Sequence, residues 1–82
     1  MNSLDDIRNK LMQLYRKNPN VHINAVIAHP KMYLKNEAVV IKGVYPHIFQ
    51  VAERKGKHPQ THTFQYSDVL LHTVEIIELG YI

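Results

Sequence analysis

The sequence predicts a mainly β domain in which one N-terminal helix precedes a small five-stranded barrel. Hydrophobic residues recur at helical spacing through the first 17 residues, and at every second position in short segments after residue 20. Proline, glycine and asparagine punctuate the chain between these segments. The helix is expected over about residues 3–17 and the barrel over about residues 20–79.

The N-terminal segment has the features of one amphipathic helix. Ser3 can cap it, and Asp5 and Asp6 place negative charge where a helix exposes its free N–H groups. The apolar positions recur on one stripe: Leu4, Ile7, Leu11, Leu14 and Tyr15. Arg16 and Lys17 suit the C-terminal end, and Asn18-Pro19-Asn20 predicts the stop.

After residue 20 the hydrophobic period changes from helical spacing to two. Residues 21–27 alternate as in a half-buried strand, which His29-Pro30 ends. Residues 31–35, rich in long side chains, are expected to form a connection. A second strand over about residues 37–45 is apolar on both faces, so it needs cover on both sides, which the N-terminal helix would supply on one.

The second half of the chain predicts three more short strands. Tyr45-Pro46 forms a corner before a strand at about 47–53, and residues 54–59 form a hairpin tip before a strand at 61–66. Ser67 and Asp68 cap a single helical turn, and the last strand covers about 73–78. Five short strands with a helical turn before the last are the layout of an SH3-like or Sm-like barrel, in which closure removes most exposed edge.

Length and composition limit the kinds of function. With 82 residues the chain has room for one domain, residues 1–82, and little room for a deep enzymatic cleft. It has no cysteine, which removes disulfides and sulfur-dependent zinc sites. The start of the chain lacks the basic stretch of a secretory signal, and no apolar run is long enough to span a membrane, so a cytoplasmic location is expected.

The hairpin tip is the leading candidate for partner contact. Four cationic or titratable residues lie within five positions, namely Arg54, Lys55, Lys57 and His58, and the net charge of the chain is +3. Lys31 and Lys35 extend this patch if their segment lies on the same side, and Tyr33 is the tyrosine best placed for contact or base stacking. A charged turn that only keeps the protein soluble has the same composition.

Neither a metal site nor a catalytic site is predicted. His58 and His62 are four residues apart, but this spacing converges on one face only in a helix, which Pro59 argues against. Ser67 and Asp68 are explained as a helix cap, and no nucleophile elbow surrounds them. We therefore expect a binding protein without enzymatic activity, metal or cofactor.

Two motifs give the chain a resemblance to a known family. Residues 43–51, Gly-Val-Tyr-Pro-His-Ile-Phe-Gln-Val, and residues 64–75, Phe-Gln-Tyr-Ser-Asp-Val-Leu-Leu-His-Thr-Val-Glu, are similar to the G-x-x-x-x-Y-P-x-x-F-x-V core and the S-Y-S-Y-x-D-V-L-x-x-T-V-E ending of the Veg family of small proteins from low-GC Gram-positive bacteria. The first motif has two residues fewer before its tyrosine. The helix start, Ser3 to Ile7, is also similar, so the shared layout covers nearly the whole chain.

The resemblance implies an SH3-like barrel and a regulatory role in biofilm formation, with transcriptional control through interference with a repressor. It implies no catalytic residue or cofactor. The family usually carries a Gly-Gly-Arg-Arg-Lys run after the first strand, where this chain has residues 27–32, Ile-Ala-His-Pro-Lys-Met. This departure weakens a nucleic-acid role for that segment.

Three hypotheses for function follow from the sequence. The first is a regulatory module that binds a protein partner, such as a transcriptional regulator. The second is direct nucleic-acid binding through the basic tip, and the third is self-assembly through an unpaired edge strand.

Overall fold

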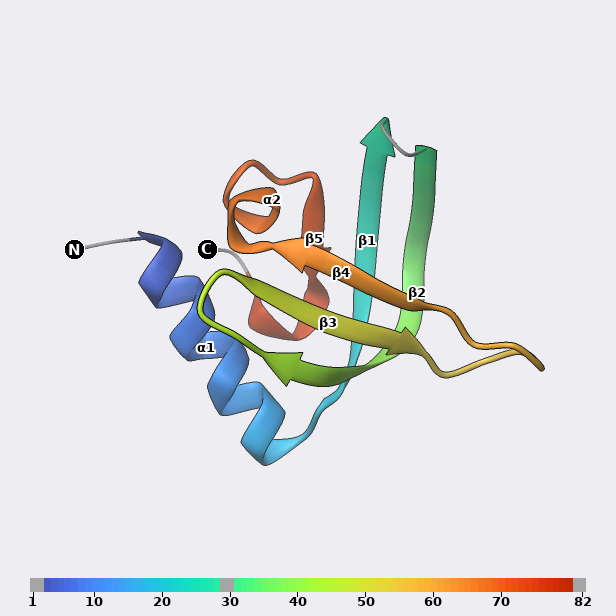
Figure 1. Ribbon diagram of the computed structural model, residues 1–82, viewed down its shortest axis with the longest axis horizontal. Helices are drawn as coiled ribbons and strands as arrows, with labels where there is room; N and C mark the ends of the chain where they lie inside the picture. The colour runs from blue at the N-terminus through green and yellow to red at the C-terminus, as the bar shows by residue number, and fades with distance from the viewer. Residues whose placement is uncertain (1–2, 29–30, 81–82) are drawn as a thin grey trace.

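The computed structural model describes residues 3–28 and 31–80 (Figure 1). The predicted end of the first strand at His29-Pro30 lies outside these residues. In chain order the elements are helix α1 (Ser3–Lys17), strands β1 (Asn20–Ala28), β2 (Lys31–Val44), β3 (Ile48–Glu53) and β4 (Thr61–Gln65), helix α2 (Tyr66–Leu70), strand β5 (Val74–Ile76) and the 3₁₀ turn η1 (Ile77–Leu79). No helix in the described part of the chain is long and apolar enough to cross a membrane.

The five strands form one antiparallel sheet in the order β4-β3-β2-β1-β5. The predicted mainly β fold, with a helix first and a short helix before the last strand, is confirmed. The sheet curls into a half-barrel, and its end strands β4 and β5 are joined by α2 rather than paired with each other (Figure 1). Among the residues that the structure describes, β4 and β5 do not pair, so the sheet stops short of the expected closure.

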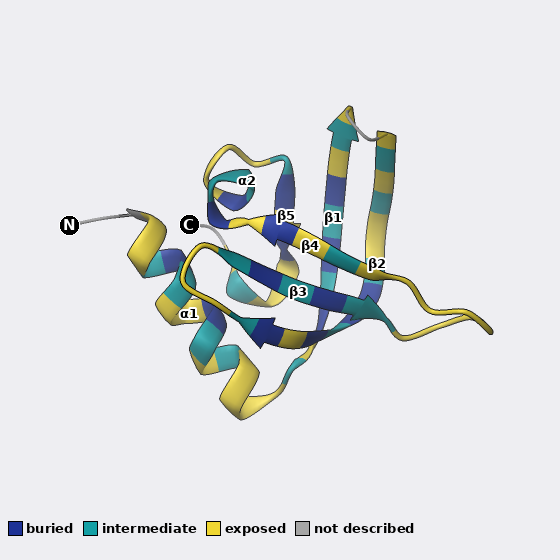
Figure 2. Cartoon of the chain, viewed as in Figure 1, coloured by how far each residue is buried: buried dark blue, intermediate teal, exposed yellow. Residues whose placement is uncertain are grey.

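Alternating apolar side chains fill the inside of the half-barrel. The strands contribute fully buried residues from both halves of the chain, and α1 adds Ile7 and Leu11 to the same cluster (Figure 2). The largest fully buried side chains on the strands are Phe49, Phe64, Ile23, Ile41 and Ile76. The helix thus covers one end of the half-barrel, as its apolar stripe predicts.

The helix stop and the first strand are joined tightly. The Asn18 N–H donates to the Leu14 carbonyl (2.8 Å), and the Ile41 N–H donates to the Pro19 carbonyl (2.8 Å). The Asn20 N–H also donates to Asn18 Oδ1 (3.1 Å). The predicted break at Asn18-Pro19-Asn20 therefore anchors the helix end to β2.

Three predicted boundaries were wrong. Residues 31–35 are not a connection, because β2 begins at Lys31 and runs for 14 residues. The last strand ends at Ile76, since Ile77–Leu79 turn into 3₁₀ geometry. Helix α2 begins at Tyr66 with Gln65 as its N-cap, and the Gln65 N–H donates to Asp68 Oδ2 (2.9 Å), so Asp68 serves the cap from inside the helix.

The two sequence motifs meet inside the fold. The Phe49 ring lies 5.7 Å from the Phe64 ring and 5.7 Å from the Tyr66 ring, centroid to centroid. The Tyr66 hydroxyl donates to the Tyr45 carbonyl, with the Ile48 carbonyl also in reach, and so ties α2 to the β2–β3 turn. Burial raises the pKa of Tyr66, against the opposing effects of Arg8 and the Tyr45 carbonyl. These motif residues are therefore structural.

Candidate partner-binding surface

The most exposed part of the sheet is a hairpin arm made by the far ends of β1 and β2. Strand β5 pairs with β1 only at Ile23–Ala25, and β3 pairs with β2 only at Val39–Val44. Beyond these contacts residues 26–28 and 31–36 continue as a two-stranded ribbon, which we call the arm (Figure 1). The arm projects beyond the strands that flank β1 and β2 at its base.

The two faces of the arm differ in burial. On the inner face Ile27, Met32 and Leu34 are partly buried and pack against the core. On the outer face Val26 and Tyr33 are cross-strand neighbours, and they stay 63% and 69% exposed. A hollow of about 400 Å³ at the arm is lined by residues of both faces, Val26 and Tyr33 among them. The outer face thus presents an aromatic and an aliphatic side chain together to solvent.

Two lysines flank this apolar pair. Lys31 and Lys35 lie two residues before and after Tyr33 on β2, so strand alternation places all three side chains on the outer face. Both lysines are exposed, and neither forms an ion pair with another described residue. The surface therefore combines an apolar centre with free positive charge.

A bulge fixes the base of the arm. The register of β1 and β2 shifts between Ile23 and Ala25, and opposite it Asn36 has a positive φ of 50°. The Asn36 N–H donates to Asn24 Oδ1 (2.7 Å), and Asn24 Nδ2 donates to Glu75 Oε1 (2.8 Å) on β5. The Asn24 and Glu75 side chains and the Asn36 backbone thus link three strands at the point where the arm leaves the sheet.

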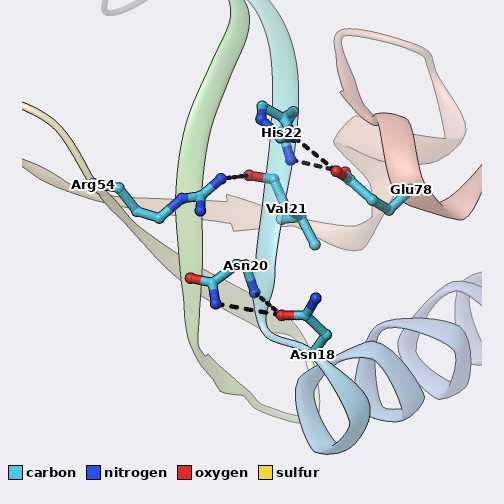
Figure 3. A network of polar contacts seen from close by, with 6 residues as sticks. All are labelled: Asn18, Asn20, Val21, His22, Arg54 and Glu78. Carbon is cyan, nitrogen blue, oxygen red and sulfur yellow. Dashed lines mark hydrogen bonds and ion pairs between the residues drawn. The ribbon is translucent and has the colours of Figure 1, made fainter.

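The predicted basic patch is divided by the fold. The Arg54 N–H donates to the Ala38 carbonyl (3.0 Å), and Arg54 Nη2 lies 3.4 Å from the Val21 carbonyl oxygen, so this side chain turns back onto β1 (Figure 3). Lys55, Lys57 and His58 are exposed on the β3–β4 loop. This loop and the arm project in different directions (Figure 1). Lys31, Tyr33 and Lys35 therefore form a surface separate from the tip.

A polar cluster that the sequence does not indicate lies beside Arg54. The His22 N–H donates to Glu78 Oε1 (2.8 Å), and His22 Nδ1 lies 2.7 Å from Glu78 Oε2 (Figure 3). Burial alone would raise the pKa of Glu78, but the hydrogen bonds from the His22 ring and backbone outweigh it and lower that pKa. The contact joins η1 to β1 across 56 residues of sequence.

The lowered pKa predicts how Glu78 contributes to stability with pH. Because the carboxyl ionises more readily in the folded than in the unfolded chain, its contribution is full above the ordinary value of 4.5 and is lost as pH falls through the folded-state value. We expect Glu78→Gln to lower the free energy of unfolding more at about pH 5.5 than at about pH 3, measured by urea unfolding. Glu37→Gln is the control, and an equal loss at both pH values would contradict the prediction.

The other histidines that the structure describes do not form a cluster. His62 Nε2 lies 2.9 Å from Glu53 Oε2, and the His62 ring stacks on Phe64 at 6.1 Å. Across residues 3–28 and 31–80, no three His, Asp or Glu side chains are grouped as a metal site would require. The described carboxylate–histidine contacts each join two strands or a strand and a turn.

The grooves beside α1 are a second feature of the surface. Two open clefts, of about 590 and 460 Å³, lie beside α1, and Arg8 and Pro46 line both. The Tyr45 ring lies over Gly43, so closely that a Cβ at Gly43 would fall 2.5 Å from the tyrosine oxygen. Arg8 Nη2 lies 3.7 Å from Asp5 Oδ1, so an ion pair within the helix partly neutralises the charge of Arg8.

Fold and surface together define a small half-barrel domain with a helical cover and one projecting hairpin arm. A family model described as "Biofilm formation stimulator VEG" matches residues 2–77. The match spans nearly the whole chain, and the chain belongs to the VEG family. No curated protein and no solved structure matches it at a significant level.

Proposed function

We propose that this chain is a small regulatory protein of biofilm formation that acts by binding another protein, a regulator of transcription, through the outer face of the arm. The observation that carries the proposal is the exposed pair Val26 and Tyr33, flanked by two lysines that form no ion pair with a described residue. The description of the family supports the biological setting. The proposal includes no catalytic step.

The composition of the arm suits a protein–protein contact. Tyrosine is enriched among the residues that dominate binding energy, and its truncation at such a site costs about 2 kcal/mol or more. The Tyr33 backbone belongs to a paired strand, so little backbone freedom is lost when the ring is covered. Lys31 and Lys35 would act at the rim, where charge sets the association rate and favours an acidic partner.

Nucleic-acid binding through Lys55, Lys57 and His58 is the second candidate. These three residues are exposed on a loop, and no ion pair joins them to a described residue. Arg54 weakens this candidate because its side chain is directed at the Val21 carbonyl. Binding of this kind would fall steeply as salt rises.

One experiment in cells separates the two candidates. The chromosomal copy is replaced by Tyr33→Ser/Lys35→Glu or by Lys55→Glu/Lys57→Glu, and biofilm biomass is measured at equal protein level by immunoblot. We expect the arm variant to match a deletion strain and the tip variant to match wild type. Loss of biofilm biomass with the tip variant alone would overturn the proposal in favour of nucleic-acid binding. Titration of labelled DNA and RNA at two salt concentrations would check that result.

A further inference from the structure

The open edge of β2 in the arm suggests how a partner would dock there, an inference that rests on the proposed function. Strand β1 lies on one side of β2 along residues 31–40, but β3 begins to pair on the other side only at Val39. The Ala38 carbonyl accepts from the Arg54 N–H, so this hydrogen bond covers the edge just beyond the arm. No described strand covers the edge from residue 31 to residue 37.

The direction of one hydrogen bond shows which backbone groups face this edge. The Val26 N–H donates to the Thr73 carbonyl (2.9 Å), on the β5 side of β1 and away from β2. Val26 and Tyr33 are direct partners in the antiparallel ladder, so theirs is the pair without mutual hydrogen bonds. The Tyr33 N–H and carbonyl therefore point away from β1, toward the open edge. No other described residue is bonded to the Tyr33 side chain or to these backbone groups, so both can meet a partner.

A second copy of this chain suits this edge poorly. Two β2 edges that pair antiparallel about Tyr33 would place Lys31 of one copy directly opposite Lys35 of the other, twice. Like charges in directly opposed positions destabilise a sheet, and edge lysines are a common protection against self-pairing. The same two positions would favour carboxylates on a foreign strand.

We propose that an extended segment of the partner protein adds to β2 as an antiparallel strand opposite residues 31–35. The partner residue opposite Tyr33 is apolar and packs on the ring and on Val26. Acidic residues two positions before and after it face the two lysines. Backbone hydrogen bonds at Tyr33 give affinity, and the alternating side chains on the outer face give specificity.

The edges of the end strands β4 and β5 offer no comparable argument. Neither strand has an outer neighbour strand in the described chain, but the exposed residues of β4 carry no charge that would select a partner, and Glu75, the exposed residue of β5, already accepts a hydrogen bond from Asn24. The arm edge is distinguished by two lysines, one aromatic ring and backbone groups of known direction.

A synthetic probe tests the docking mode without knowledge of the natural partner. The probe is the acetylated and amidated heptapeptide Thr-Glu-Thr-Val-Thr-Glu-Thr, and the control peptide has lysine in place of glutamate. With the acidic peptide at millimolar concentration, we expect NMR to show slowed exchange of the Tyr33 amide proton. The amide protons of Met32 and Leu34, which face β1, should change little. Equal effects of the two peptides, or no binding of either, would overturn strand addition.

A matched pair of variants isolates the backbone contribution. Tyr33→Ala and Tyr33→Pro both remove the ring, but only the proline also removes the outward N–H, which the fold itself does not use. We expect Tyr33→Pro to bind the acidic peptide at least about fivefold more weakly than Tyr33→Ala, in line with the loss of one hydrogen bond. The NMR spectrum of each free variant checks that the variant folds. If the proline variant does not fold, the slowed exchange of the Tyr33 amide in the peptide-bound wild-type protein remains the test of the backbone contribution.

The outcomes separate this inference from the proposed function. If Tyr33→Ser/Lys35→Glu abolishes biofilm formation while the two Tyr33 variants bind the peptide equally, the arm is the binding surface and strand addition is wrong. If Tyr33→Ser/Lys35→Glu also leaves biofilm formation at the wild-type level, the proposed function is wrong as well. A dimer in light scattering with a protected Tyr33 amide in the free protein would overturn the inference, because the edge would then be filled by a second copy.

Discussion

Substitution of Phe49 by alanine is expected to lower the free energy of unfolding by about 3–5 kcal/mol. The Phe49 ring is fully buried, and it lies between Phe64 and Tyr66, 5.7 Å from each ring centroid. Its removal leaves a cavity where the two family motifs meet, and it also loses two aromatic contacts. Because a domain of this size has a total stability of only about 5–15 kcal/mol, such a loss is severe.

Equilibrium urea unfolding measures this effect, with an unchanged slope showing that the same surface is exposed on unfolding. Tyr33→Ala is the matched control, because this aromatic ring is 69% exposed and its removal should change stability by less than about 0.5 kcal/mol. A loss below about 1 kcal/mol at Phe49 would contradict its place at the centre of the core.

Substitution of Leu11 by alanine should cost about 2–5 kcal/mol. Leu11 is fully buried with Ile7 in the same cluster as the strands, so the effect measures how strongly α1 is coupled to the half-barrel. Loss of this contact would expose apolar surface at the end of the half-barrel that the helix covers. The expected result is one cooperative transition at lower urea concentration, followed both by far-UV circular dichroism and by tyrosine fluorescence.

The control for the helix is Lys10→Ala, an exposed position where the change should be within about 0.5 kcal/mol. Separate transitions for helix and sheet signals in the Leu11 variant would show that α1 is an independent unit. A change at Leu11 as small as that at Lys10 would contradict the packing of the helix on the sheet.

Local patterns predict most of the fold. The apolar stripe and the Asn18-Pro19-Asn20 stop locate α1, and the alternation from Val21 to Ile27 locates β1. Residues 31–35 are a strand in which Met32 and Leu34 alternate with Lys31, Tyr33 and Lys35. The stretch follows a proline and is rich in long side chains, which favours the predicted connection, and only the pairing with β1 reveals it as a strand.

The candidate surface could be predicted only in part. The residue types at Lys31, Tyr33 and Lys35 indicate contact with a partner, but the sequence does not separate them from the basic tip. The contact of Arg54 with the Val21 carbonyl and that of His22 with Glu78 join residues 33 and 56 positions apart. Such contacts depend on which strands lie side by side, and no local pattern contains that information.

The central claim is that the outer face of the arm contacts a protein in the cell, and site-specific photocrosslinking tests it most directly. A benzoylphenylalanine is incorporated in place of Tyr33, or in place of His58 on the basic tip as the matched control, and cells are irradiated during biofilm formation. We predict a discrete protein adduct at position 33 that is absent at position 58. An adduct at position 58 with none at position 33 would contradict the account.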